Sequence, residues 1–250
     1  MDLGLGGRSA LVMASTRGIG LATAQAYHRE GANVTICGRD RAALDAAAAT
    51  MPGAAAVAGD VTDPAALERI FAAATDAFGS PEILVVNAGG PPPGAFDSLD
   101  DAAWTKAVDM TLMSAIRAAR LALPAMRERR WGRIVIVSSY GVKQPVPGLT
   151  LSNSVRMAVL GWAKTLARQV AGDNILVNTV CPGWTRTDRV RKLVSGDAAA
   201  EARIEAGIPL GRMGEPGEIA NLAVFLGSAA ASYMTGTAVQ VDGGLVEGYA

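Results

Sequence analysis

The 250-residue chain has no net formal charge, because 23 Lys and Arg residues balance 23 Asp and Glu residues, and half of its residues are apolar. This balance favours one large globular domain over a nucleic-acid or membrane-surface protein, and no apolar run approaches the roughly 20 residues of a membrane span. Two cysteines and one histidine argue against a histidine-rich zinc site and suit a reducing compartment, so we expect a cytoplasmic protein without a metal site.

Short apolar runs alternate with helical patterns along the whole chain. The runs predict strands at 9–12, 33–37, 54–58, 83–86, 133–137, 175–180 and 238–241. Helices are expected between them at 20–30, 41–50, 64–78, 102–129 and 153–171. This alternation predicts an α/β fold of the Rossmann type, in which a doubly wound parallel sheet is covered by helices on both faces. We expect residues 1–250 to form a single domain, with the polar, alanine-rich stretch 185–214 as a lid over the substrate.

The turn after the first strand reads Met-Ala-Ser-Thr-Arg-Gly-Ile-Gly at 13–20. Gly18 and Gly20 stand where the next helix begins, so the backbone can approach a diphosphate and the helix N-terminus can supply N–H donors. Ser15 and Thr16 add hydroxyl groups. The turn therefore predicts a dinucleotide-binding site, and the simpler alternative is a plain tight turn.

The end of the second strand bears on the choice of dinucleotide. An acidic residue there would bind the ribose 2′-hydroxyl of NAD, but this chain has Gly38 followed by Arg39. Arg39 and Arg17 would suit a 2′-phosphate through charge-assisted hydrogen bonds. We predict NADP(H) in preference to NAD(H); the alternative is that both arginines are solvated surface charges.

Further motifs follow in order: GDVTD at 59–63, VNAG at 86–89, IVIVSS at 134–139, VNTVCPGWTRTD at 177–188 and VDGG at 241–244. Together with the turn they resemble the short-chain dehydrogenase/reductase family over essentially the whole chain. The resemblance implies a seven-stranded sheet, an oxidoreductase of carbonyl or alcohol substrates, and a homodimer or homotetramer. The subunits would pack through the helices around 102–129 and 153–171 and through the last strand.

The resemblance also implies where the cofactor lies, with 60–61 at the adenine, 87–89 along the cofactor and 182–187 at the nicotinamide half. The predicted cofactor-binding residues are Ser15, Arg17, Gly18, Ile19, Gly20, Arg39, Asp60, Val61, Asn87, Ala88, Gly89, Pro182, Gly183, Thr185 and Thr187. One departure lies in the turn, where the family usually begins Thr-Gly and this chain has Met13 and Ala14. We expect ordinary backbone angles at Ala14 and slightly weaker packing.

The catalytic positions depart further from the family, which uses a serine, a tyrosine, a lysine four residues later and an asparagine on the preceding helix. Ser139 matches the serine. The run AVLGWAKTLA at 158–167 fixes the register of the catalytic helix and places Ser152 at the tyrosine position and Arg156 at the lysine position. The asparagine position holds Thr111.

These changes alter the chemistry that the site can perform. A phenol has a pKa of about 10, whereas an aliphatic hydroxyl is far less acidic and an arginine cannot pass a proton along. Loss of general acid–base catalysis typically costs about 10²–10⁴-fold in rate, which predicts a slow reductase unless another group substitutes. Tyr140 is the candidate substitute, with Lys143 or Arg156 as its cation; the alternative is that Tyr140 only packs.

Two other functions remain open at this point. Ser139, Ser152 and Thr111 beside Arg156 could bind an anionic substrate and stabilise an enolate or oxyanion, as in a redox-neutral lyase, dehydratase or isomerase. The chain could instead be a non-catalytic nucleotide-binding protein. Trp184, with arginines at 186 and 189, could accept a planar or acidic substrate; the alternative is that this segment is lid surface with one packed tryptophan. Our prediction is an NADP(H)-binding oxidoreductase with an atypical catalytic site.

Overall fold

In the computed structural model, which describes residues 1–194 and 197–248, seven parallel strands form one sheet in the order β3-β2-β1-β4-β5-β6-β7. This confirms the predicted fold class. The strands are β1 (Ser9–Val12), β2 (Asn33–Gly38), β3 (Ala55–Ala58), β4 (Ile83–Val86), β5 (Gly132–Val137), β6 (Ile175–Pro182) and β7 (Ala238–Val241). Most are apolar throughout because helices cover both faces of the sheet.

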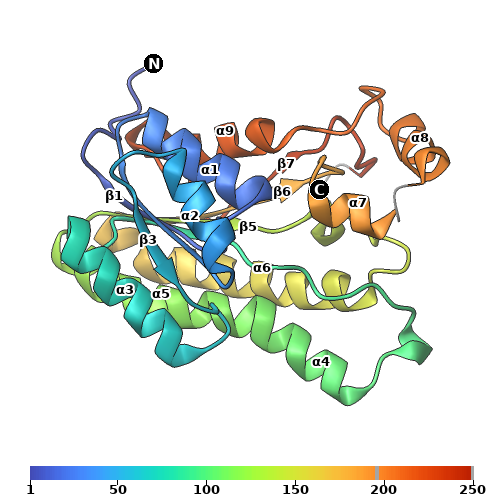
Figure 1. The fold of residues 1–250 in the computed structure, drawn as a ribbon, viewed down its shortest axis with the longest axis horizontal. Coiled ribbons are helices and arrows are strands. Elements are labelled where there is room, and N and C mark those ends of the chain that lie inside the picture. The colour runs from blue at the N-terminus through green and yellow to red at the C-terminus, as the bar shows by residue number, and fades with distance from the viewer. Residues whose placement is uncertain (195–196, 249–250) are drawn as a thin grey trace.

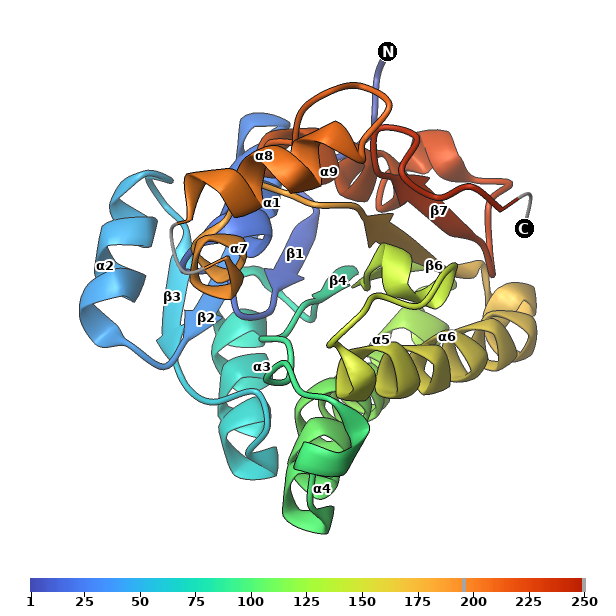
Figure 2. The ribbon, with the colours of Figure 1, turned by 90° about the vertical axis from the view of Figure 1, so that its right-hand side faces the viewer.

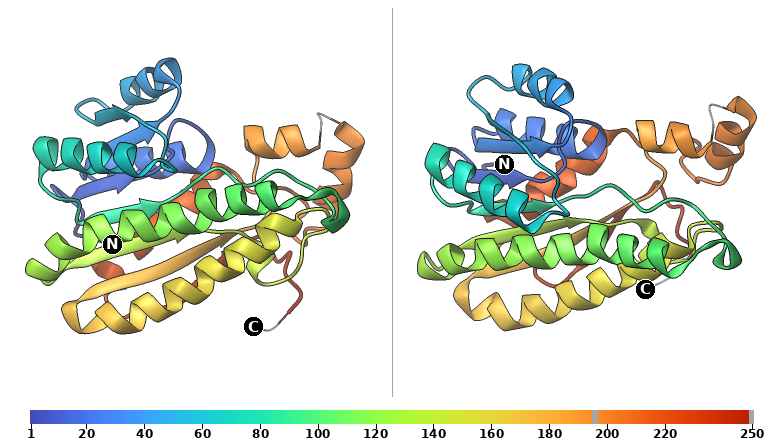
Figure 3. Two further views of the ribbon diagram at one scale, coloured as in Figure 1. Left: turned by 90° about the horizontal axis from the view of Figure 1, so that it is seen from below. Right: turned by 60° about the horizontal axis from the view of Figure 1, so that its bottom comes forward.

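The helices form two layers around the sheet (Figure 1). They are α1 (Gly18–Arg29), α2 (Arg41–Ala49), α3 (Pro64–Phe78), α4 (Asp101–Val108), α5 (Ser114–Glu128), α6 (Thr150–Val170), α7 (Asp188–Leu193), α8 (Ala198–Ala206) and α9 (Pro216–Leu226). One core cluster lies under α1, α2 and α9, and the other lies under α3, α5 and α6. Figure 3 shows α5 and α6 running side by side along the second face.

Two helical predictions differ from the structure. The helix expected at 102–129 is divided by a π-helical segment, Asp109–Met113, between α4 and α5. The helix α9 was not predicted, although it has a capping box in which Glu215 and Glu218 accept N–H donors from each other's backbone. Pro216 at its first position adds a second start signal.

The strand order reverses between β1 and β4, since β2 and β3 lie on one side of β1 and the later strands lie on the other. In such sheets the loops at the carboxyl ends of the strands diverge at this point and leave a crevice for ligands. The helices α7 and α8 lie beyond these strand ends (Figures 1 and 2). Their segment is closed at its base, because Thr185 and Gly214 form a parallel bridge.

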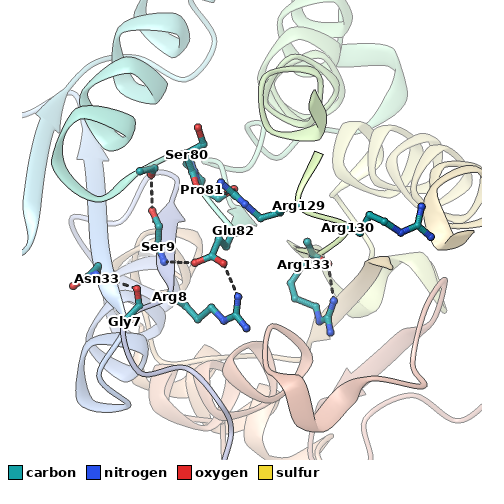
Figure 4. Close-up of polar contacts among 12 residues, drawn as sticks. Gly7, Arg8, Ser9, Asn33, Ser80, Pro81, Glu82, Arg129, Arg130 and Arg133 are labelled. Atoms are coloured by element: carbon teal, nitrogen blue, oxygen red, sulfur yellow. Dashed lines mark hydrogen bonds and ion pairs between the residues drawn. The ribbon is translucent and has the colours of Figure 1, made fainter. Parts of the chain in front are cut away.

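The amino-terminal ends of the strands carry a separate cluster of polar and aromatic side chains, which Figure 4 shows in part. The Glu82 carboxylate accepts hydrogen bonds from the Arg8 guanidinium at 2.5 Å and from the Ser9 backbone at 3.1 Å. The guanidinium carbons of Arg8 and Arg133 lie 4.1 and 4.3 Å from the centre of the Trp131 ring. This cluster ties β1, β4 and β5 together at the end opposite the crevice. Within the described ranges no helix is long and apolar enough to cross a membrane.

Candidate active site

A cleft of about 1100 Å³ lies over the carboxyl ends of the strands. Its walls come from the turn before α1, the ends of β2, β4 and β5, the start of α6, and the segment from residue 182 to α7. All the predicted cofactor-binding residues except Ser15 line it. Of the predicted catalytic residues, Ser139, Tyr140, Ser152 and Arg156 line it and Thr111 does not.

The glycine-rich turn is shaped for close backbone contact. A Cβ atom at Gly20 would lie 2.6 Å from the carbonyl oxygen of Ala14 and 2.6 Å from Nδ2 of Asn87, so only glycine fits there. Gly18 has a φ of 56°, in the left-handed region. Arg17, the N-cap residue of α1, makes no side-chain capping bond among the described residues, so the first N–H groups of α1 are available to a ligand at the cleft.

Ser15 differs from the prediction. Its hydroxyl donates a hydrogen bond to the carbonyl of Val12 at 2.6 Å and accepts one from the backbone N–H of Cys37 at 3.2 Å. The side chain is fully buried and joins the turn to β2, so Thr16 is the hydroxyl-bearing residue of the pair that reaches the cleft. This difference between Ser15 and Thr16 could not be predicted from the sequence, because both residues stand in the same turn.

The expectation of ordinary backbone angles at Ala14 is wrong. Its φ is 47°, in the left-handed region that disfavours a Cβ atom by roughly 1–2 kcal/mol. The side-chain amide of Asn87 donates to the carbonyls of Met13 and Ala14, at 3.2 and 3.1 Å, and holds the strained conformation. Asn87 therefore fastens the end of β4 to the turn.

The end of β2 carries the features that were predicted to choose the dinucleotide. A Cβ atom at Gly38 would lie 2.3 Å from Cγ2 of Thr16, so the Thr16 side chain takes the space where an acidic side chain would begin. Arg39 is 76% exposed, and its guanidinium lies 3.5 Å from the carboxylate of Asp60. Burial raises the pKa of Asp60, but hydrogen bonds from Thr62 and the charge of Arg39 outweigh it, so the net shift is downward.

The other end of the cleft holds Ser139, Ser152 and Arg156. Ser152 and Arg156 are four residues apart on α6 and share a helix face. The Arg156 guanidinium donates from Nε to the Ser152 hydroxyl at 3.2 Å and from a terminal nitrogen to the carbonyl of Val137 at 3.2 Å. Ser139 Oγ accepts a hydrogen bond from the backbone of Gly141 at 3.1 Å. Both serine hydroxyls thus act as acceptors within the protein and keep their own protons for a ligand.

Tyr140 and Trp184 form an aromatic wall of the cleft. Their ring centres lie 6.1 Å apart at an angle of 54°. Burial raises the pKa of Tyr140 to about 12, and among the described residues no positive charge lowers it, so the expected activation of this phenol by Lys143 or Arg156 is not seen. Thr111 lies in the π-helical segment, which packs against α6, and its buried hydroxyl has no partner among the described residues.

The predicted lid residues separate into two groups. Arg189 donates to the carbonyls of Gly90 and Pro91, at 2.7 and 2.9 Å, and lines the cleft. Arg186 instead pairs with Glu205 at 2.6 Å and with Glu215 at 3.5 Å, which places its charge on carboxylates outside the cleft. Sequence reasoning could not distinguish the two arginines, because they are three residues apart in one segment.

Ser138 is among the cleft residues that the sequence did not predict. Ser138 lines the cleft, is only 7% exposed, and its hydroxyl has no hydrogen-bond partner among the described residues. The serine doublet Ser138-Ser139 at the end of β5 is the signal in the sequence that could have indicated it.

Residues 13–246 match the family model described as "Enoyl-(Acyl carrier protein) reductase". The chain belongs to the short-chain dehydrogenase/reductase family. It is 36% identical over 245 residues to "Dehydrogenase/reductase SDR family member 4" of Homo sapiens, a match that covers 96% of this chain and 88% of the relative. It is 34% identical over 243 residues to 3-oxoacyl-[acyl-carrier-protein] reductase FabG of Escherichia coli, covering 96% and 97% of the two chains.

Solved structures of short-chain dehydrogenase/reductase type agree over the full length. L-Sorbose reductase from Gluconobacter frateurii, solved with NADPH and L-sorbose, superposes with a TM-score of 0.94 at 31% identity and covers 99% of this chain and all of its own. YwfH, an NADPH-dependent reductase of bacilysin biosynthesis, superposes with a TM-score of 0.92 at 29% identity and covers 96% and 99%. The chain is accordingly an NAD(P)-dependent oxidoreductase of this family.

The cleft fits the cofactor of this family on the structure's own terms. The start of α1 has no side-chain cap among the described residues, and the absence of a side chain at Gly20 lets a diphosphate approach the backbone there. The cleft continues from there past Arg39 at one end and past Ser139 at the other, so one extended ligand can reach both.

Proposed function

We propose that this protein is an NADP(H)-dependent reductase of carbonyl compounds in which Ser152 and Arg156 stand where the family has its tyrosine and lysine. The observation that carries the choice of NADP(H) is the adenosine end of the cleft. Arg17 and Arg39 flank it, and the Thr16 side chain occupies the space of an acidic residue at position 38. Two of the similar structures are described with NADPH, which supports the same choice.

The turn at Gly18–Gly20 would hold the diphosphate, and Arg17 with Arg39 would hold the 2′-phosphate. Arg39 is paired with Asp60 through a single contact of 3.5 Å between exposed groups, and such a pair contributes little stability. A phosphate carrying about two charges can therefore draw Arg39 away at small cost. The bound nicotinamide would supply or accept the hydride.

The chain's own groups then act on the carbonyl oxygen. The hydroxyls of Ser139 and Ser152 donate hydrogen bonds to it and stabilise the negative charge that develops as the hydride arrives. The Arg156 guanidinium donates to Ser152 Oγ, which makes the Ser152 hydroxyl a stronger donor to the carbonyl oxygen. Any proton that Ser152 passes to this oxygen is replaced on Ser152 by one from solvent in the open cleft, so the net proton comes from water. Arg156 itself stays charged, and its anchor on the carbonyl of Val137 keeps the pair in register with β5.

Tyr140 offers a second route for the proton. A phenol with a pKa of about 12 is neutral at physiological pH and can still protonate an alkoxide, which is far more basic. The two routes are separated by Tyr140→Phe and Ser152→Ala. A large loss of turnover in the first variant alone would assign the proton to Tyr140, and a loss in the second alone would assign it to Ser152.

A redox-neutral reaction is the second candidate. Two serine hydroxyls in one cleft with a fixed cation, which donates to Ser152, suit an enolate as well as an alkoxide. A product that forms without a change in absorbance at the NADPH band would favour this function.

Two further predictions concern the lid and the assembly. Segment 185–214 is proposed to be a lid over the substrate. The protein is proposed to form a homodimer or homotetramer, because Leu121 on α5 and Met157 on α6 are exposed apolar residues on the helices that are expected to pack between subunits.

The dissociation constants of NADPH and NADH, measured by fluorescence titration, test the cofactor proposal. We expect NADPH to bind at least tenfold more tightly, and Arg39→Gln to remove most of that difference while NADH affinity stays within twofold. Arg41→Gln is the matched control, because Arg41 is exposed nearby on α2 and pairs with Asp45. Tighter binding of NADH, or equal binding of the two, would overturn the proposal.

A further inference from the structure

The substrate end of the cleft contains two guanidinium groups from different helices, and the charge of one acts on the other. Arg156 comes from α6, and Arg189 comes from α7 and is seated on the chain after β4. A Cβ atom at Gly90 would lie 2.4 Å from the Arg189 guanidinium carbon, so Gly90 lets this group lie flat against the backbone. Neither arginine forms an ion pair within the part of the chain that the structure describes.

The acidic residues that line the cleft lie elsewhere and are already engaged. Asp40 caps α2, Asp60 binds Thr62 and Arg39, and Asp188 pairs with Arg191 at 3.1 Å. Cys181 provides no negative charge either, because burial raises the pKa of its thiol to about 11. Asp242, whose charge also acts on Cys181, does not line the cleft, and its carboxylate accepts hydrogen bonds from the backbone of Gly244 and Val246. Among the described residues that line the substrate end, the partly buried Arg156 and the exposed Arg189 therefore form no ion pair with a carboxylate.

The two cations affect each other. Burial, and then the charge of Arg189, lower the pKa of Arg156 to about 10, which still leaves it fully charged at neutral pH. Like charges in one partly desolvated compartment repel, and a bound anion removes that cost.

Donors to receive an anion are present. A guanidinium has five N–H groups, and Arg156 uses two of them, for Ser152 and Val137, so three remain. The buried, unpartnered hydroxyl of Ser138 lines the same cleft. The aromatic pair of Tyr140 and Trp184 forms an apolar wall beside these donors.

We infer that the substrate is a carbonyl compound with an apolar body and a carboxylate group, and that Arg156, with Arg189 in the same cleft, binds the carboxylate. A guanidinium and a carboxylate match in planar geometry and can form two parallel hydrogen bonds. This substrate class rests on the proposed reductase function for its turnover, but the binding of the carboxylate does not depend on turnover.

The test is isothermal titration calorimetry of the protein saturated with NADP⁺, using phenylacetate and its neutral isostere phenylacetamide as probes. We expect phenylacetate to bind at least tenfold more tightly than the amide. Arg156→Gln and Arg189→Gln should each weaken phenylacetate at least fivefold, leave the amide within twofold, and leave NADP⁺ affinity within threefold. Arg168→Gln, on the exposed side of the same helix α6, is the matched control and should change none of these values.

Equal affinity for the acid and the amide in the unmodified protein would overturn the inference, and this comparison needs no variant to fold. The inference would also be overturned if Arg156→Gln weakened the binding of NADP⁺ while the preference for phenylacetate over phenylacetamide persisted. Arg156 would then bind the cofactor and not the carboxylate. Failure of the reductase proposal appears separately, as absence of NADPH oxidation with phenylpyruvate and with its methyl ester. A methyl ester reduced as efficiently as the acid would count against the carboxylate site.

Discussion

Arg133 and Arg156 stand at opposite ends of the same sheet, and in both burial lowers the pKa of the guanidinium to about 10. Arg133, only 2% exposed, donates to the carbonyls of Ser228, Gly132 and Asn174 at 2.9–3.2 Å and stacks on Trp131. Arg156 donates hydrogen bonds to one carbonyl and one hydroxyl, and it lines an open cleft.

The difference lies in what the protein provides for each charge. Carbonyl oxygens and an aromatic ring surround Arg133 and join β5 to the chain before β6 and after α9, so its charge stabilises the fold. Arg156 keeps donors that the fold does not use, which is how a group that binds a ligand differs from one that holds a structure. The comparison predicts that loss of Arg133 affects stability and loss of Arg156 affects binding.

The largest effect is expected for Arg133→Gln. The shorter side chain leaves buried carbonyls without donors and removes the stacking on Trp131, so we expect the free energy of unfolding to fall by about 3 kcal/mol. Urea denaturation measures it. Arg129→Gln is the control, because Arg129 is exposed and its bond to the Ser80 carbonyl should contribute less than about 1 kcal/mol. A loss below 1 kcal/mol in Arg133→Gln would show that this cluster is not structural.

Ser152→Ala tests the other end of the sheet. Removal of one hydrogen-bond donor to a developing oxyanion typically lowers kcat about 10²-fold, and we expect that loss with little change in stability. Ser154→Ala is the matched control on α6, since the Ser154 hydroxyl donates to the carbonyl of Thr150 away from the cleft. Steady-state rates with NADPH measure the loss. Equal rates in the two variants would show that the Ser152 hydroxyl takes no part in the reaction.

Ala14→Gly should stabilise the protein. Glycine relieves the strain at a φ of 47°, worth roughly 1–2 kcal/mol, but adds about 0.4–1 kcal/mol of entropy to the unfolded chain, so the expected net gain is about 1 kcal/mol or less. The same change at Ala22, inside α1, should instead destabilise by about 1 kcal/mol. Thermal denaturation of both variants measures the contrast, and a destabilised Ala14→Gly would mean that the turn is not strained.

The smallest effect is expected for the exposed ion pair between Arg212 and Glu218 at the start of α9. A hydrogen bond from Arg212, followed by one from the Glu215 backbone, lowers the pKa of Glu218 to about 2. A depressed carboxyl pKa stabilises the fold above its ordinary value of 4.5, and that stabilisation is lost as the pH falls through about 2. In Arg212→Gln the Glu218 pKa should rise toward 4.5, which a carbon-detected NMR titration measures. Arg203→Gln should leave it unchanged, and an unmoved pKa in Arg212→Gln would contradict the assignment.

The sequence predicted the sheet well because strands buried on both faces must be apolar throughout, as at 83–86 and 175–180. It did not predict α9, although Pro216 precedes an apolar run, or the break at 109–113, because one π-helical turn is too short to show in the hydrophobic pattern. At the site it placed most cleft residues, since motif order follows strand order. It could not see that Ser15 turns inward, that Ala14 is strained, or that Arg186 and Arg189 diverge, because each depends on contacts with residues distant in the chain.

The central claim is that Arg133 stabilises the fold while Arg156 recognises an anion, and one paired measurement tests it most directly. Arg133→Gln and Arg156→Gln are each assayed for the free energy of unfolding and for the dissociation constant of phenylacetate in the presence of NADP⁺. We predict that Arg133→Gln loses about 3 kcal/mol and keeps its affinity, whereas Arg156→Gln stays within about 1 kcal/mol and binds at least fivefold more weakly. Equal losses of stability with unchanged affinity in both variants would contradict it.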